Sequence, residues 1–169
     1  MDAAIEADTG ALYRLDPDFS LSKHDEGYRV TNGPAFTRDG RTLYHNDTAK
    51  RVVYAFPLHA DGSLGERRVF IRFRDEWGHP DGMTVDAEDG LWIAHWGGGR
   101  VSRFTPEGEL DRSITLPASQ ITSCVFGGTD LDRLFVTSAA DRRDHEPHAG
   151  KLFEVEPRVR GVPQPRFAG

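Results

Sequence analysis

The stretch NGPAFTRDGRTLYHNDTAKRVVYAF, residues 32–56, decides the fold because its pattern recurs twice further along the chain. Residues 81–104 read DGMTVDAEDGLWIAHWGGGRVSRF, and residues 123–140 read SCVFGGTDLDRLFVTSAA. Each unit has a small polar residue, a short apolar strand, an acidic turn and further hydrophobic strands. The units start near residues 32, 81 and 123, at offsets of 49 and 42 residues. Repeats of roughly 40–50 residues with about four strands each predict the blades of a β-propeller.

Short strands along the whole chain, inside and outside these units, extend the prediction to an all-β fold. The predicted strands are residues 11–16, 21–28, 42–47, 51–58, 67–73, 82–86, 91–96, 100–105, 112–116, 123–127, 133–138 and 151–156. Clusters of Asp, Asn and Gly between them favour tight turns. Only two strands precede residue 32, and the last unit supplies three. Residues 1–169 therefore read as a single, partial propeller domain of about three and a half blades, an incomplete ring. Its open edges predict a homodimer through edge pairing.

Composition excludes several classes of function. The chain has 21 Lys+Arg and 27 Asp+Glu, a formal net charge of −6, and no basic run. We expect no nucleic-acid partner, because that affinity depends on neutralising phosphates. We also expect no membrane partner, since no apolar run approaches the ~20 residues of a bilayer span. The N-terminal MDAAIEADTG lacks the features of a secretory signal. With one cysteine, Cys124, the chain fits a reducing compartment, so we predict a cytoplasmic protein.

Two polar residues hold the same position in consecutive units, and each precedes a glycine. These residues are Asn32 and Asp81. Equivalent positions of propeller blades converge at the central channel. An amide oxygen with a carboxylate suits Ca²⁺, Mg²⁺ or Mn²⁺ and also accepts Zn²⁺. The alternative is that Asn-Gly and Asp-Gly are ordinary turn dipeptides. Ser123 holds the third equivalent position, where it either hydrogen-bonds a substrate or satisfies a strand edge.

Other polar features have competing interpretations. His79 and Trp77 lie just before Asp81 on a predicted loop over the channel mouth. Either side chain contacts a sugar, or Trp77 only packs against the next blade. Residues 97–99 are three glycines, which indicate a tight turn, since no Lys-Ser/Thr follows to make a phosphate loop. The segment DRRDHEPHAG, residues 141–150, has HxxH spacing but favours a solvated loop.

Several segments closely resemble the SMP-30/gluconolactonase/regucalcin family, with bacterial sugar lactonases nearest. They are TNGPAFTRDGRTLYHNDT (31–48), HPDGMTVDAEDGLWIAHWGGGRVSRFTPEGE (79–109), TSCVFGG (122–128), LFVTSA (134–139) and the ending HAGKLFEVEPRVRGVPQPRFAG (148–169). The resemblance covers nearly all of the chain after residue 9. It implies a six-bladed propeller that binds one divalent cation and hydrolyses sugar-acid lactones.

The resemblance also implies roles for individual residues. Asn32 and Asp81 match two metal ligands of the family, and Asp81 is the candidate general base. The family's third ligand, a Glu, and its substrate-binding Arg and Asn have no counterpart here. The initial Met-Asp, residues 1–2, resembles the tail of the family's GTMD strand, so the chain corresponds to the family's C-terminal portion. His79 and Ser123 are the candidate substrate-binding residues.

The resulting prediction is a metal-dependent lactonase of the gluconolactonase or xylonolactonase type. Its cofactor is one divalent cation, Ca²⁺, Zn²⁺ or Mn²⁺, and its partner is a small sugar lactone. The alternative is a catalytically inactive propeller fragment that acts as a ligand-binding or interaction module.

Overall fold

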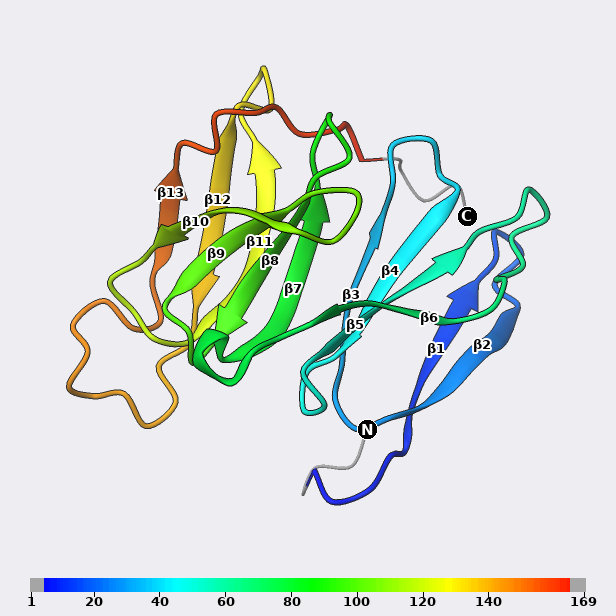
Figure 1. Ribbon diagram of the computed structural model, residues 1–169, viewed down its shortest axis with the longest axis horizontal. Helices are drawn as coiled ribbons and strands as arrows, with labels where there is room; N and C mark the ends of the chain where they lie inside the picture. Colours follow the sequence, from blue (N-terminus) through cyan, green and yellow to red (C-terminus); the bar gives the residue numbers. More distant parts are fainter. Residues whose placement is uncertain (1–4, 165–169) are drawn as a thin grey trace.

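The computed structural model describes residues 5–164, which form four antiparallel sheets in chain order (Figure 1). The first sheet holds β1 Gly10–Leu15 and β2 Leu21–Tyr28. The second holds β3 Thr31–Phe36, β4 Thr42–Asp47, β5 Val52–Pro57 and β6 Arg68–Arg72. The third holds β7 His79–Val85, β8 Leu91–Trp96, β9 Arg100–Phe104 and β10 Leu110–Thr115. The fourth holds β11 Ile121–Gly127, β12 Arg133–Ser138 and β13 Leu152–Val155.

Strand order within each sheet follows the chain, as expected for propeller blades made of consecutive hairpins. No α-helix occurs between residues 5 and 164; a single 3₁₀ turn, η1 Asp75–Trp77, precedes β7. In the same range no helix is long and apolar enough to cross a membrane. The all-β prediction and the propeller prediction are confirmed. Residues 1–2 and 165–169, which belong to the segments that resemble the family, lie outside the described residues.

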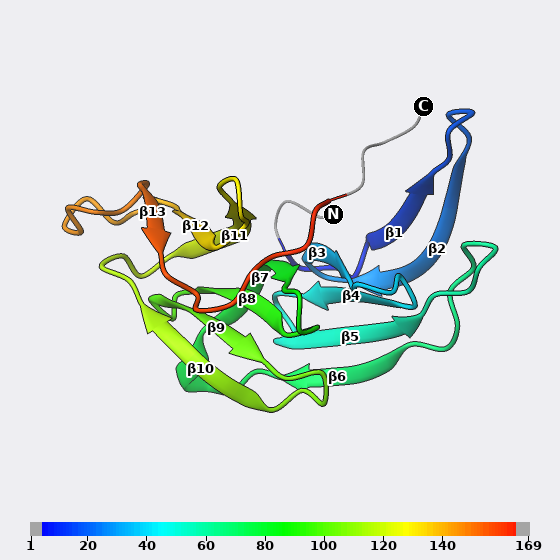
Figure 2. The same ribbon diagram turned by 90° about the horizontal axis from the view of Figure 1, so that it is seen from above.

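The four sheets stand side by side in an open arc (Figure 2). Strands β3, β7 and β11 line its concave side, and β6 and β10 lie on its convex side. β7 contacts both β3 and β11, so the first strands of three sheets are neighbours. All three run in the same direction and therefore begin at the same edge of the arc, the lower edge in Figure 1.

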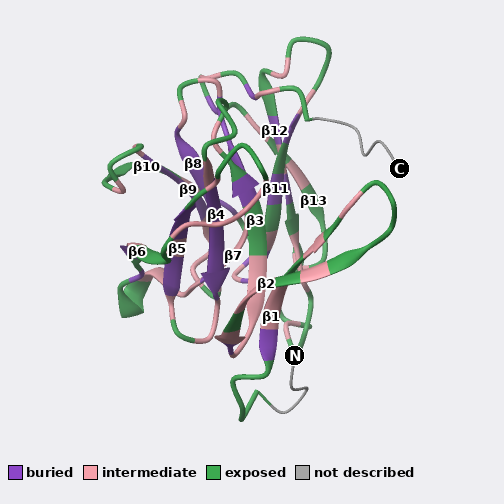
Figure 3. Ribbon diagram, turned by 90° about the vertical axis from the view of Figure 1, so that its right-hand side faces the viewer, coloured by how far each residue is buried: buried purple, intermediate pink, exposed green. Residues whose placement is uncertain are grey.

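Two hydrophobic cores fill the spaces between neighbouring sheets. One packs Tyr44 and Val53 of the second sheet against Ile93 of the third. The other packs Trp92 of the third sheet against Phe126 of the fourth. Successive residues of β8 thus point into different cores, as the alternation of a strand requires, which explains why LWIAHW is apolar throughout. Figure 3 shows burial concentrated in the central strands, while β2 is mostly a mixture of exposed and intermediate residues. Cys124 is buried in the second core.

The inner strands begin earlier than the sequence pattern predicts. β7 starts at His79 rather than at residue 82, and β11 starts at Ile121 rather than at residue 123. Asn32 likewise lies inside β3. Each of these strands contains an irregularity in pairing. A dipeptide such as Asp-Gly resembles a turn in the sequence, although the strand continues through it as a bulge. Asn-Gly and Asp-Gly are therefore strand residues here, so their interpretation as simple turns is wrong.

Candidate metal and active site

The predicted ligands lie where the regular pairing of the inner strands is interrupted. The register of β3 against β4 shifts between Asn32 and Ala35, and that of β7 against β8 shifts between Pro80 and Met83. The register of β11 against β12 shifts between Ile121 and Ser123. All three shifts fall at the position that the sequence repeat makes equivalent. Bulges re-aim side chains and are frequent beside active sites. The repeat therefore preserves a local backbone distortion as well as a strand pattern.

Asn32 and Asp81 line one open cavity of about 470 Å³ at the edge where the inner strands begin. The rest of its lining is Ile5, Val30, Thr48, Ala49, His79 and Trp96. His79 and Trp96 pair directly across β7 and β8, so they form one side of the cavity together. The structure thus brings three of the four predicted site residues into one cavity: Asn32, Asp81 and His79.

The Asn32 side chain is held by a hydrogen bond from its amide nitrogen. Asn32 Nδ2 donates to Thr48 Oγ1 at 2.9 Å, and the Thr48 hydroxyl donates to Asn46 Oδ1 at 3.3 Å. Because the amide oxygen and nitrogen lie on opposite sides of the same carbon, the Oδ1 of Asn32 is directed away from Thr48. This oxygen is therefore left for a ligand in the cavity.

Asp81 is half-buried and has no cationic neighbour. Between residues 5 and 164, no Lys, Arg or His forms an ion pair with its carboxylate. Burial raises the pKa of the Asp81 carboxyl to about 6, and a hydrogen bond from the Gly82 backbone opposes this only in part. A half-buried carboxylate without a positive partner is destabilised in its charged form, and a bound cation relieves that cost.

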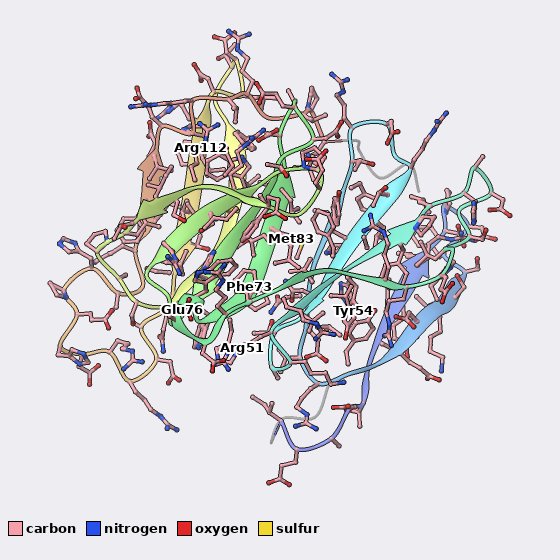
Figure 4. All side chains as sticks on the ribbon, viewed as in Figure 1. Arg51, Tyr54, Phe73, Glu76, Met83 and Arg112 are labelled. Carbon is pink, nitrogen blue, oxygen red and sulfur yellow. The ribbon has the colours of Figure 1, made fainter. Side chains whose placement is uncertain are left out.

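His79 lines the cavity with both ring nitrogens engaged. Its Nδ1 lies 2.9 Å from the Thr48 carbonyl oxygen, which can only accept, so Nδ1 carries the proton. Its Nε2 then accepts from Arg51 Nη2 at 3.3 Å. Arg51 is itself held by Asp75 at 2.9 Å, and Figure 4 shows it near the lower edge of the arc. His79 therefore offers the cavity its ring surface, not a free nitrogen.

Ser123 and Trp77 lie beside the site. Ser123 is exposed on β11 and packs on the glycine after Asp81: a Cβ on Gly82 would lie 2.4 Å from Ser123 Oγ. Trp77 packs against the first core, with its ring 5.6 Å from that of Phe73. Packing is thus the reading of Trp77 that the structure supports. The loop of residues 141–150 supplies Glu146, which accepts from the Ser119 backbone and hydroxyl.

Two residues of the site were not predicted from the sequence. Asn46 is fully buried at the end of β4, and its Nδ2 donates to the Asp81 carbonyl oxygen at 2.7 Å. Thr48 connects Asn46 to Asn32. The available signal was polarity: NDT, residues 46–48, ends a strand that would otherwise bury apolar side chains.

The donor set fits a hard divalent cation. Asn32 Oδ1 and the Asp81 carboxylate are oxygen ligands of the kind that Ca²⁺, Mg²⁺ and Mn²⁺ prefer. The absence of an ion pair for Asp81 within the described range favours the same assignment. Across residues 5–164 no group of three or more His, Cys, Asp or Glu residues converges on one point. The described chain therefore contributes an amide–carboxylate pair and no acidic or imidazole cage.

These features define a β-propeller with a candidate oxygen-ligand site where its inner strands begin. The sequence pattern of the SMP-30/Gluconolactonase/LRE-like region matches residues 1–140, and the chain belongs to this family.

Relatives with curated names support the assignment. Regucalcin of Gallus gallus is 38% identical over 99% of this chain and 58% of its own length. The 6-deoxy-6-sulfogluconolactonase of Pseudomonas putida is 37% identical over 95% of this chain and 57% of its own length. The solved structure of a calcium-binding protein, regucalcin, from Agrobacterium tumefaciens superimposes with a TM-score of 0.90 at 32% identity, covering 99% of this chain and 59% of that one. This chain therefore spans less than two thirds of the length of these relatives.

Proposed function

We propose that this chain carries part of the site of a cation-dependent lactonase, which hydrolyses a sugar-acid lactone to the open hydroxy acid. The observation that carries the proposal is the convergence of Asn32 and Asp81 in one cavity, each on the bulge of a neighbouring inner strand. A relative named as a 6-deoxy-6-sulfogluconolactonase supports the reaction class, and one named as a calcium-binding protein supports the cation.

Asn32 Oδ1 and the Asp81 carboxylate would hold the cation, which is Ca²⁺, Zn²⁺ or Mn²⁺. A divalent cation bound there supplies a Lewis acid that polarises a carbonyl and lowers the pKa of water. Asp81 then has a second role as general base. Its carboxylate lines the same cavity as Asn32, so it is placed to accept a proton from a water molecule held there.

Hydrolysis of the lactone consumes one water molecule. Water oxygen bonds to the lactone carbonyl carbon while Asp81 accepts a water proton. The bond between that carbon and the ring oxygen then breaks, and the proton passes to the ring oxygen, which leaves as a hydroxyl group. His79 and Trp96, paired across β7 and β8, offer ring surfaces to the apolar face of a sugar. Ser123 supports the Asp81-Gly82 bulge through its contact with Gly82.

Lactone hydrolysis followed with a pH indicator tests the proposal. The protein is stripped with a chelator and assayed on gluconolactone and xylonolactone, with Ca²⁺, Zn²⁺ or Mn²⁺ added separately. We expect a cation-dependent rate above the uncatalysed one, and Asp81→Asn should return it to the uncatalysed rate. His148→Phe, an exposed change outside the cavity, is the matched control and should keep the rate. Uncatalysed rates with all three cations would instead support a non-catalytic binding module.

A further inference from the structure

A hydrogen-bonded chain joins the two predicted ligands across two sheets. Its fully buried member is Asn46, at the end of β4, while Asn32, Thr48 and Asp81 are half-buried. Asn46 Nδ2 donates to the Asp81 carbonyl oxygen at 2.7 Å, so it reaches from the second sheet to the third. Asn46 Oδ1 accepts from the Thr48 hydroxyl at 3.3 Å, and Thr48 Oγ1 accepts from Asn32 Nδ2 at 2.9 Å.

Each bond in this chain has a defined direction. A carbonyl oxygen can only accept, so the Asn46 group facing Asp81 is its NH₂. Its Oδ1 then faces Thr48, and the single hydroxyl proton of Thr48 is used in that bond. The hydroxyl oxygen of Thr48 accepts a hydrogen bond from Asn32 Nδ2. This bond fixes the Asn32 amide with its nitrogen toward Thr48 and its oxygen toward the cavity. The orientation of Asn32 thus depends on Asn46 through Thr48.

The same residue also fixes the backbone that carries Asp81. The Asp81 carbonyl lies at the register shift of β7, where pairing with β8 is interrupted. A carbonyl at a bulge lacks its regular ladder partner, and an unpaired buried acceptor is costly. Asn46 supplies a donor from the neighbouring sheet. One side chain therefore sets the position of both candidate ligands relative to each other.

We propose that Asn46 and Thr48 are positioning residues for the cation, which hold Asn32 Oδ1 and the Asp81 bulge in register before the cation binds. This inference rests on the proposed function and adds to it the residues that pre-organise its ligands. Groups that orient metal ligands typically affect metal affinity by 10- to 100-fold.

Substitutions at Thr48 and Asn46 can remove single hydrogen bonds of this chain while they keep the shape of the side chain. Thr48→Val keeps the shape of the side chain and removes the hydroxyl that links Asn46 to Asn32. Thr48→Ser keeps the hydroxyl. Asn46→Asp is nearly isosteric but sets a carboxylate oxygen against the Asp81 carbonyl oxygen, where no proton is available to join them at neutral pH.

The experiment is calcium titration by calorimetry on chelator-stripped protein, with melting temperatures recorded for each variant. Thr48→Val should weaken calcium affinity by about 10-fold or more, and Thr48→Ser should retain it within a small factor. Thr137→Val is the matched control, because it removes a hydroxyl-to-hydroxyl bond to Thr122 outside the cavity. It should leave calcium affinity unchanged.

A second readout needs no cation. In the metal-free protein, the side-chain amide protons of Asn32 should exchange slowly by NMR in the wild type and in Thr48→Ser, and quickly in Thr48→Val. Wild-type calcium affinity in Thr48→Val, with unchanged Asn32 amide exchange, would overturn the positioning role alone. A wild-type protein that binds no calcium, zinc or manganese would overturn the proposed function and this inference with it.

Discussion

His45 is a buried histidine whose two ring nitrogens have no hydrogen-bond partner within residues 5–164. Its ring packs edge-on against Tyr28, with the centroids 4.7 Å apart. Burial lowers the pKa of His45 to about 4, although the charges of Asp25 and Asp47 act in the opposite direction. The folded state therefore favours the neutral ring, while the unfolded chain accepts a proton near pH 6.5. The stability that the neutral His45 ring contributes is fully present above about pH 6.5 and is lost as the pH falls toward 4.

Replacing His45 with Phe should flatten this pH dependence. The variant has no group to protonate, so its melting temperature should fall less than that of the wild type between pH 7 and pH 4.5. His95, whose pKa burial also lowers to about 4, leaves a residual slope of the same sign. Thermal melts across this pH range make the measurement, with exposed His148→Phe as the control. An identical slope in His45→Phe and the wild type would contradict the assignment.

At the scale of single residues, the sequence identifies the two candidate ligands but not the residues that hydrogen-bond to them. Asn32 and Asp81 could be found because a repeat makes their positions equivalent and each precedes a glycine. Asn46 could not be found in this way. Its function arises from packing between two sheets, where its amide reaches the Asp81 backbone 35 residues away along the chain. Nothing in the pattern of β4 itself specifies that contact.

At the scale of elements, the third sheet is held by a buried ionic cluster around Arg103 of β9. Arg103 Nε lies 2.6 Å from Asp86 Oδ2, and its Nη1 lies 3.1 Å from Asp111. The Asp86 carboxylate also accepts from the Trp92 indole at 2.8 Å. These bonds tie the end of β7 to β8, β9 and β10.

Arg103→Leu should destabilise the protein by about 3–5 kcal/mol, because it leaves the fully buried Asp86 carboxylate without its cation. The matched control is Arg133→Leu, which breaks an ion pair with Glu154 whose side chains are 49% and 47% exposed. Exposed pairs contribute about 0–1 kcal/mol. Chemical denaturation measures both changes. Equal losses in the two variants would show that burial of the Arg103 cluster does not decide its contribution.

Strand positions were largely predictable, and the starts of the inner strands were not. Short runs of hydrophobic residues identify β4, β5, β8 and β9, and most residues of these strands are buried. β7 and β11 were predicted to start at residues 82 and 123, but they start at His79 and Ile121. The bulges interrupt the period of two at the residues that form the site. Local irregularity and function therefore coincide, and both escape a pattern based on regular strands.

At the scale of the whole molecule, the sheets at the two ends of the arc have fewer strands than the two sheets between them. In the described chain β1 pairs only with β2, and β13 pairs only with β12. Exposed apolar side chains accompany these edges: Tyr13 and Leu15 on β1, and Leu152 on β13. Unpaired edges with apolar residues favour pairing with another chain. We therefore expect a second copy of this chain to pair at these edges.

Light scattering coupled to gel filtration tests this expectation. The wild-type protein should elute at twice the 18.8 kDa chain mass, and Leu15→Lys with Leu152→Lys should shift it to the single mass. Val69→Lys is the control, because Val69 is also exposed but lies on β6 of the second sheet, between the two end sheets of the arc. A single-chain mass for the wild type at all concentrations would exclude the edge-paired dimer.

The proposed function requires Asn32 and Asp81 to bind one divalent cation together. Calorimetric titration of chelator-stripped protein with calcium measures this binding in the wild type, Asn32→Leu and Asp81→Asn. We expect one calcium ion per chain in the wild type and, in each variant, a loss of affinity greater than the roughly 10- to 100-fold typical of groups that only orient a ligand. Wild-type affinity in both variants, or no binding of calcium, zinc or manganese by the wild type, would contradict it.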